Sequence, residues 1–271
     1  MHGGPQRPDY NCLMRVLSAI ESRLPKGWGD LGRQVLILVG VDLAYTAVRG
    51  IADGERTVAM ANGQQVIEFE QSVHGLFEPH LQAFFLHAEW VIDLANQLYL
   101  NAQFSVALGF LVWLYFFRNE SYNFVRNMFV IAMGLALVGY TLYPTAPPRM
   151  FPEYGFVDTI NKFSGINHDS AIAKSFINPF AAIPSMHCAF AVMIGGTGAL
   201  VCRHWWSRAF WASWPLLILW VVIVTGNHYW LDAVLGWMVA ITAAVVAQRL
   251  FARARPEAWS FRTSASREAE A

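Results

Sequence analysis

Long apolar segments separated by short polar ones most strongly constrain how this chain can fold. Hydrophobic residues make up 55% of its 271 residues and charged residues only 14%, which is too apolar for an ordinary soluble domain. An α-helix needs about 20 apolar residues to cross a bilayer. The sequence contains six candidate spans, near residues 31–49, 90–117, 127–143, 185–202, 209–226 and 228–249. It therefore predicts an all-α integral membrane protein built as a six-transmembrane-helix bundle.

The flanks of this apolar region divide the chain into three parts. Residues 1–30 are polar without a central apolar block, so we expect a cytosolic N-terminal segment and no cleavable signal peptide. Residues 31–250 form the predicted six-helix membrane domain, which holds every candidate catalytic residue. Residues 251–271 are rich in Arg, Glu, Ser and Ala and are predicted to be a disordered cytosolic tail.

The distribution of Lys and Arg orients the bundle, because cytoplasmic loops are enriched in these residues. With the N-terminus inside, the inner connections carry Arg118, Arg126, Arg203 and Arg208, and the C-terminal end carries further arginines. The outer segments hold only Arg49, Arg56, Arg149, Lys162 and Lys174. We therefore predict a multi-pass protein of the cell membrane with both termini cytoplasmic. Basic residues gather in no stripe and the formal net charge is zero, so nucleic acid is not an expected partner.

Between the first two predicted spans, apolar residues recur at helical spacing beside three glutamates. This pattern predicts an amphipathic helix on the outer interface, which either covers the bundle or guides a lipid to the site. The residues concerned are Val66, Phe69, Val73, Leu76 and Phe77, with Glu68, Glu70 and Glu78. Inside the first span, Asp42 is interpreted as hydrogen-bonded within the bundle, with a polar relay as the alternative.

Two short histidine motifs lie in this apolar sequence, PSMH at residues 184–187 and NHYWLD at residues 227–232. An ionisable side chain is costly inside a bilayer and is usually kept there for chemistry or transport. The predicted topology places His187 at the outer start of the fourth span and His228 at the outer start of the sixth. Both motifs are therefore expected on the outer face of the membrane.

The second motif has the spacing of a nucleophile and the group that orients it. His228 and Asp232 are four residues apart at the start of a helix, so their side chains share one face and can touch. A carboxylate on one ring nitrogen fixes the tautomer and leaves the other nitrogen as a base or nucleophile. From these two residues alone, a buried polar pair that only locks helices together is an equal alternative.

The first motif and a proline-rich segment add groups that suit a phosphate. His187 lies at a predicted helix N-terminus, where free amides attract anions, and is suited to be a general acid. Ser185 can cap that helix or donate a hydrogen bond to the phosphate. In the segment YPTAPPRM at residues 143–150, three prolines stiffen the chain before Arg149, whose planar fork can bind two phosphate oxygens. Taken alone, Arg149 can equally be an interfacial anchor.

These motifs resemble those of the type 2 phosphatidic acid phosphatase superfamily, which carries KxxxxxxRP, PSGH and SRxxxxxHxxxD in this order on a six-helix membrane core. The resemblance spans roughly residues 127–249. It implies that His228 attacks phosphorus to form a phosphohistidine and that Asp232 orients it. It further implies that His187 protonates the leaving group and that Arg149 clamps the phosphoryl oxygens.

Three positions depart from the phosphatase pattern. Leu142 stands where the first motif has lysine, Val222 where the third has arginine, and Met186 where the second has glycine. Either Lys162, His168 or Lys174 replaces the missing cations, or the substrate carries less charge, as a phosphodiester does. The PTAPPR, PSMH and NHYWLD segments are similar to those of the inositol phosphorylceramide synthase branch, which implies inositolphosphotransferase-like chemistry on a phosphodiester lipid.

The sequence therefore predicts an integral-membrane lipid phosphotransfer enzyme that moves a phospho-head-group to a lipid alcohol or to water, with no cofactor and no metal. Its residues fall into a catalytic set and a set that binds phosphate or lines the substrate site. A lipid phosphate phosphatase, of the phosphatidic acid or isoprenyl phosphate type, is the alternative within this chemistry. A non-catalytic membrane transporter or a haem protein is the alternative from another class. The candidate residues are His228, His187 and Asp232 for catalysis, Arg149 and Ser185 for phosphate, and Lys162, His168, Lys174 and Asn227 for lining the substrate site.

Overall fold

The computed structural model describes residues 24–51, 56–101, 105–164 and 180–262, together with residues 18, 21 and 22. Within these ranges the chain is helical without any strand, and one β-bridge joins Thr145 to Ala181. The all-α prediction is confirmed. The helices are α2 (Gly27–Ile51), α3 (Arg56–Ser72), α4 (Glu78–Phe85), α5 (Glu89–Asn101), α6 (Ala107–Phe117), α7 (Asn119–Leu142), α8 (Thr159–Ser164), α10 (Met186–Val201), α11 (Trp205–Val224), α12 (Trp230–Val246) and α13 (Pro256–Trp259), with 3-10 helices at Pro148–Met150 and Pro152–Tyr154 and a π-helical turn at Ala247–Ala252.

Three of the described helices are long and apolar enough to cross a membrane: α7, α11, and α12 with its extension to Ala252. Helices α6 and α10 are also apolar but shorter. Between 33% and 44% of the apolar stretch of each long helix is buried inside the protein. Much of the remaining apolar surface faces outward, which is the arrangement that a lipid environment stabilises and water does not. The chain is a membrane protein; the count of six spans remains a prediction.

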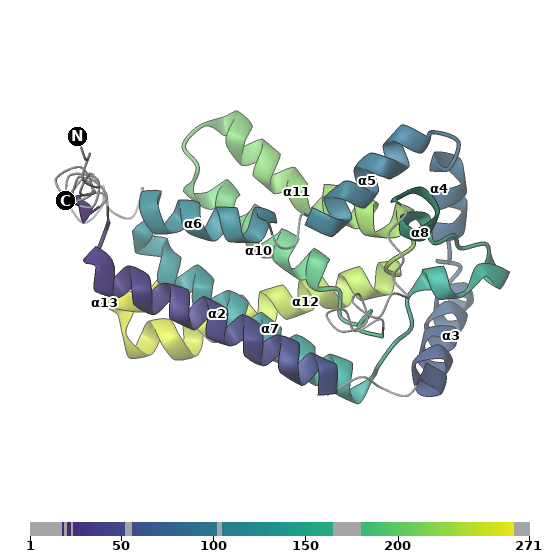
Figure 1. Ribbon diagram of the computed structural model, residues 1–271, viewed down its shortest axis with the longest axis horizontal. Coiled ribbons are helices and arrows are strands. Elements are labelled where there is room, and N and C mark those ends of the chain that lie inside the picture. Colours follow the sequence, from purple (N-terminus) through teal and green to yellow (C-terminus); the bar gives the residue numbers. More distant parts are fainter. Residues whose placement is uncertain are drawn as a thin grey trace, which may run out of the picture.

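Helix α10 lies at the centre of the bundle and packs against α7, α11 and α12 (Figure 1). Two glycines let α11 approach it closely: a Cβ added at Gly195 would lie 2.6 Å from the Trp211 carbonyl oxygen, and one at Gly198 would lie 2.4 Å from the Trp211 ring. On the other side, a Cβ at Gly236 of α12 would lie 2.2 Å from the Ser185 carbonyl oxygen. Small residues therefore bring the starts of α10 and α12 together.

The expected single span at residues 90–117 is divided into α5 and α6. Helix α5 packs against α8 and α11, whereas α6 packs against α7 and α10. Helix α5 ends at Asn101, whose side chain folds back to donate to the Gln97 carbonyl at 2.8 Å. Its buried Asn96 side chain donates to the Thr159 carbonyl on α8 at 3.1 Å. Polar residues thus tie this half of the expected span to neighbouring elements at one end of the bundle.

The expected amphipathic helix is two helices, α3 and α4, which meet at a turn where His74 has a left-handed φ of 56°. They lie with α5 and α8 at one end of the molecule, whereas α13 lies at the other (Figure 1). Glu70 and Glu78, expected on the polar face, are fully buried, while Phe69 and Phe77 are 45% and 46% exposed. The physical reason is that both glutamates accept hydrogen bonds from the start of α12.

The tail expected to be disordered from residue 251 is ordered as far as residue 262. The Ser121 hydroxyl of α7 donates to the Arg262 carbonyl, and the Asn123 amide donates to the Ala258 carbonyl at 3.1 Å. The rings of Phe124 and Phe261 lie 5.5 Å apart. Aromatic residues in an otherwise polar tail thus find apolar partners on α7. Residues 263–271 lie outside the described residues.

Candidate active site

Backbone hydrogen bonds join the three motifs at the end of the bundle where α7 ends and where α10 and α12 begin. In the proline-rich segment, the Thr145 amide donates to the Phe180 carbonyl at 2.7 Å, just before the PSMH motif. In that motif, the Ser185 amide donates to the Asp232 carbonyl at 3.0 Å, so the first turns of α10 and α12 are tied directly. Segments far apart in sequence therefore form one rigid frame.

Gly226 completes this frame because only a glycine fits its position. Its φ is +69°, in the left-handed region, and an added Cβ would lie 2.8 Å from the Val157 carbonyl oxygen and 2.9 Å from the Gln82 amide nitrogen. The Gly226 carbonyl accepts the backbone N–H of Arg149 at 2.8 Å. The tight turn before His228 thus also fixes the backbone that carries Arg149.

His228 and Asp232 make the contact that their spacing predicts. Nδ1 of His228 lies 3.1 Å from Oδ2 of Asp232, which also accepts the Tyr229 backbone N–H at 3.1 Å. Asp232 is fully buried and His228 is 5% exposed. Burial lowers the pKa of His228, and repulsion by Arg149 lowers it further, although a hydrogen bond to the Ala182 carbonyl raises it. Burial and Arg149 therefore favour the neutral imidazole. With its proton on Nδ1, facing Asp232, the neutral ring leaves Nε2 free as a nucleophile.

His187 is held beside this pair by Tyr99 of α5. The two rings stack with centroids 4.3 Å apart and planes at 21°, and Nε2 of His187 lies 3.2 Å from the Tyr99 carbonyl oxygen. Because a carbonyl only accepts, this contact places a proton on Nε2 and leaves Nδ1 to exchange protons with a substrate. The ring centroids of His187 and His228 lie 5.7 Å apart.

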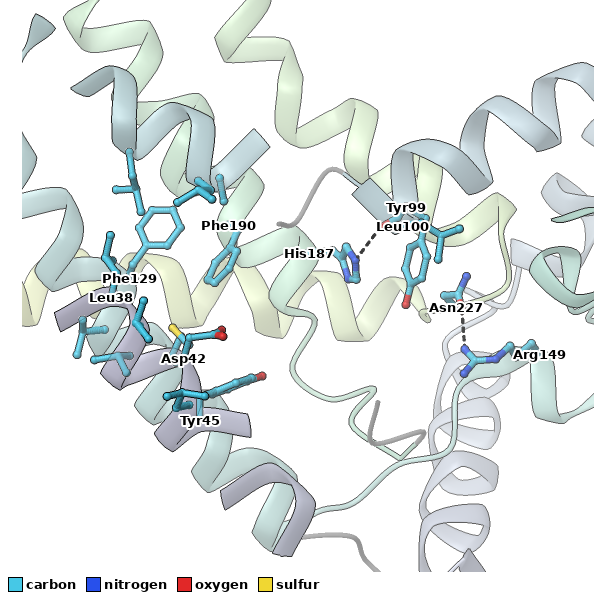
Figure 2. A pocket seen from close by; sticks show the side chains of 18 residues that line it. Leu38, Asp42, Tyr45, Tyr99, Leu100, Phe129, Arg149, His187, Phe190 and Asn227 are labelled. Atoms are coloured by element: carbon cyan, nitrogen blue, oxygen red, sulfur yellow. Dashed lines mark hydrogen bonds between the residues drawn. The ribbon is translucent and has the colours of Figure 1, made fainter. Parts of the chain in front are cut away.

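Arg149 faces the same place from the 3-10 helix Pro148–Met150 (Figure 2). Its Nη1 donates to Oδ1 of Asn227 at 2.5 Å, and its Nε lies 3.8 Å from Oδ2 of Asp158. The Asn227 amide in turn donates to the Thr225 hydroxyl at 2.9 Å. These contacts set the direction of the guanidinium fork while leaving it on the wall of a cavity.

A cavity of about 600 Å³ opens beside these groups. Its polar wall is formed by Arg149, Asn227, His187 and Tyr99, and the rest of its lining is mostly apolar side chains from α2, α6 and α7. His228 does not itself line the cavity, but its ring lies next to that of His187, which does. The volume is within the range of pockets that hold small organic ligands.

The remaining predicted site residues that the structure describes, Ser185 and Lys162, do not line the cavity. Ser185 is fully buried and caps α10, where its hydroxyl accepts the Cys188 N–H at 3.4 Å, and it does not line the cavity. Lys162 is exposed on α8, with Nζ 5.2 Å from the centroid of the Phe163 ring. His168 and Lys174 lie outside the described residues. Among the residues that are described, no group of three His, Cys, Asp or Glu residues could hold a metal ion.

Two contributors to the site had not been predicted. Tyr99 gave no signal because it reads as one more aromatic residue in an apolar run, and only the fold stacks it on His187. Asp158 lies between the predicted spans 127–143 and 185–202, and its approach to Arg149 depends on how this connection folds.

Comparisons with known proteins agree with these motifs. The profile of the PAP2 superfamily matches residues 64–246. A curated protein of Bacteroides thetaiotaomicron named phosphoinositol dihydroceramide synthase is 26% identical over 179 residues. This match covers 60% of the present chain and 58% of the relative, so the chain spans little more than half of that protein's length. No solved structure matches significantly.

Proposed function

The chain belongs to the PAP2 superfamily and is a phosphotransferase or phosphatase of that superfamily, and from this premise we propose that it transfers a phosphoinositol-type head group between lipids. In this proposal, the donor is a phosphodiester lipid, the acceptor is a lipid alcohol such as dihydroceramide, and a phosphohistidine at His228 is the intermediate. The observation that carries the proposal is the oriented His228–Asp232 pair, with the His187 ring 5.7 Å away and Arg149 on the adjoining wall.

The charge of the cavity favours a phosphodiester over a phosphomonoester. Among the described residues that line it, Arg149 is the one Lys or Arg. One guanidinium balances the single negative charge of a diester, whereas a monoester dianion needs a second cation. The positions that hold further cations in the phosphatase pattern are Leu142 and Val222 here. The name of the relative points in the same direction, since it describes a protein that makes a phosphoinositol lipid.

In the first step, Nε2 of His228 attacks phosphorus while the P–O bond to the donor's diacylglycerol breaks. Asp232 holds the proton on Nδ1 and stabilises the charge that the ring acquires. Attack requires the tautomer with no proton on Nε2, so the ring does not donate to the Ala182 carbonyl in this state. His187 enters this step as the imidazolium, with a proton on each ring nitrogen; it gives its Nδ1 proton to the departing alkoxide and becomes neutral, while Arg149 binds the phosphoryl oxygens throughout.

In the second step, the same groups work in reverse. The hydroxyl of the acceptor lipid gives its proton to Nδ1 of His187, and its oxygen attacks phosphorus. The P–N bond to His228 breaks, which restores the neutral imidazole. If water replaces the lipid alcohol, the outcome is hydrolysis, so the acceptor that reaches the cavity decides between transferase and hydrolase.

The same proposal covers the placement of the enzyme. Residues 31–250 form the membrane catalytic domain, both termini lie in the cytoplasm, and the active site opens at the outer face. Ser185 acts as the cap that fixes the first turn of α10, where His187 lies.

A direct test uses purified protein in lipid vesicles with labelled phosphatidylinositol or labelled phosphatidic acid, each with and without dihydroceramide. We expect a new phosphoinositol lipid from the first donor only when dihydroceramide is present. We expect His228→Ala to form neither this product nor a labelled phosphoenzyme. Release of free phosphate from phosphatidic acid, with no head-group transfer, would establish a phosphatase instead. Turnover by His228→Ala would rule out the phosphohistidine route.

A further inference from the structure

The cavity extends well beyond the residues that act on phosphate. Opposite Arg149 and His187, its wall is formed by α2, and most of the remaining apolar lining comes from α6 and α7. The apolar residues include Leu38, Leu111, Phe129 and Met133. A head group with its phosphate at Arg149 does not need this apolar part, whereas a lipid that presents its hydroxyl to the phosphohistidine does.

One carboxylate interrupts this apolar wall. Asp42 lines the cavity in the middle of α2, between Leu38 and Tyr45, which lie on the same face of the helix (Figure 2). Asp42 is exposed in the structure. It makes no hydrogen bond or ion pair with any described residue. Among the described residues, Asp42 thus lacks the hydrogen bond inside the bundle that was expected of it.

Asp42 is not needed to attach α2 to the bundle, because other polar residues of α2 make the hydrogen bonds to neighbouring helices. Asp30 accepts hydrogen bonds from Gln34 and from the Tyr115 hydroxyl, both at 3.1 Å. Gln34 accepts a hydrogen bond from the buried Arg126 of α7. These contacts lie near the start of α2, two or more turns before Asp42. An ionisable side chain that faces a cavity from an apolar wall, with no partner in the described part of the chain, is the usual mark of a ligand contact.

We propose that Asp42 binds the acceptor lipid by accepting hydrogen bonds from its hydroxyl or amide N–H groups, while the apolar wall holds its hydrocarbon chains. The inference rests on the proposed function. A carboxylate repels the phosphodiester of the donor, so it does not suit the phosphate subsite. An inositol ring, with hydroxyls on every side, would leave most of them unpaired among apolar neighbours. A sphingoid-type alcohol has few donors and long chains, which match one carboxylate in an apolar wall.

This placement gives Asp42 a role in choosing between lipid alcohol and water. Figure 2 shows Asp42 and Tyr45 on one wall of the cavity, with His187, Asn227 and Arg149 across from them. An acceptor anchored on α2 therefore projects its reacting hydroxyl toward His187. Without that anchor, water has freer access to the phosphoenzyme.

The test measures binding of the acceptor and reaction with the donor independently. We would measure the KM for dihydroceramide and, without acceptor, the rate at which His228 is labelled from phosphatidylinositol. For Asp42→Leu we expect the acceptor KM to rise about tenfold to a hundredfold, the loss typical of a hydrogen bond to a charged group. Phosphoenzyme labelling should stay within about twofold of wild type. Asp42→Glu, which keeps the carboxylate, should recover part of the acceptor affinity.

Two controls connect the effect to the proposed contact. Leu36→Ala alters an exposed side chain of α2 that does not line the cavity and should change neither half-reaction. A dihydroceramide analogue lacking the secondary hydroxyl should bind wild type more weakly and lose less affinity in Asp42→Leu. An unchanged acceptor KM in Asp42→Leu, or a rise in the donor KM instead, would overturn the inference.

Binding of a fluorescent dihydroceramide to the protein in nanodiscs gives a readout that does not depend on turnover. Weaker binding to Asp42→Leu than to wild type and Leu36→Ala supports the inference, and equal binding overturns it. If wild type transfers no head group, the proposed function is wrong. The binding comparison still tests the role of Asp42, because it does not depend on turnover.

Discussion

At the scale of single residues, Asp232 serves both the helix and the reaction. Its Oδ2 accepts the Tyr229 N–H at the start of α12 and lies 3.1 Å from Nδ1 of His228. Capping requires only an acceptor, whereas the reaction also uses the negative charge beside the histidine. A substitution that keeps one property and removes the other can therefore separate the two roles.

We expect Asp232→Asn to fold but to lose activity by roughly 10³- to 10⁴-fold. The same oxygen, Oδ2, accepts the Tyr229 N–H and faces Nδ1 of His228. An amide in its place has two orientations. With its oxygen there, both contacts remain but the negative charge that stabilises the phosphorylated ring is lost. With its NH₂ group there, the ring proton moves to Nε2, which removes the lone pair needed for attack. Turnover and phosphoenzyme formation are the measurements, with the melting temperature as a check of folding.

Asp93→Asn is the matched control, because Asp93 is exposed on α5 and does not line the cavity. It should retain wild-type turnover. If Asp232→Asn also kept activity near wild type, the carboxylate would be only a structural cap.

At the scale of elements, the N-terminus of α12 is capped by side chains from three different parts of the chain. Glu78 of α4 accepts the Trp230 N–H at 2.9 Å, and Glu70 of α3 accepts the Leu231 N–H at 3.2 Å, next to the Asp232 cap. Negative charge and acceptors at a helix start are stabilising. The helix that begins just after His228 is thus fixed to α3 and α4.

The two glutamates are close enough to affect each other's protonation. Burial raises the pKa of Glu70 to about 10, and the neighbouring Glu78, which hydrogen-bonds to it, contributes to the rise. In the unfolded chain the carboxyl has a pKa near 4.5. The folded protein therefore keeps a proton on Glu70 that the unfolded chain releases, and stability falls as pH rises from about 4.5 to about 10.

We expect Glu70→Gln to reduce this decline in stability. The amide keeps an acceptor for the Leu231 N–H and a donor for Glu78, but it has no proton to release. Melting temperatures recorded between pH 5 and pH 9 should fall less steeply for Glu70→Gln than for wild type. Glu68→Gln, at an exposed position on the same helix, should follow the wild-type curve. If the melting temperatures of Glu70→Gln and wild type fell equally with pH, Glu70 would not be the group that keeps a proton in the folded protein.

At the scale of the whole molecule, the active site and the turn between α10 and α11 lie at opposite ends of the bundle. Helix α10 starts beside the site and has 16 residues, which correspond to about 24 Å along its axis. Cys202 follows its last residue and is partly exposed, whereas Glu153 is exposed shortly after Arg149. In the proposed topology, these two positions lie on opposite sides of the membrane.

We expect an impermeant maleimide added to intact cells to label Glu153→Cys in a background without the native cysteines. A second variant that retains only Cys202 should be labelled after lysis alone. The reason is the excess of Lys and Arg in the connections at the Cys202 end, which predicts a cytoplasmic location. The reverse labelling pattern would place the active site on the cytoplasmic side.

Local patterns in the sequence were sufficient to predict the helical fold and the contact between His228 and Asp232. Apolar runs mark α7, α10, α11 and α12, because a helix in lipid satisfies its own backbone and needs only apolar side chains. The spacing of His228 and Asp232 fixes their contact within one helical turn. These features depend on residues close together in the chain, so they can be read without knowing which helices meet.

Tertiary structure decided what depends on elements far apart in the chain. It stacked Tyr99 on His187, joined Arg149 to Asn227, and divided the expected span at residues 90–117. It also buried Glu70 and Glu78 against α12 and left Asp42 facing a cavity. A polar side chain reads alike in sequence whether it is paired or free. Only the packing of helices determines which polar groups find partners in the protein and which remain for a ligand.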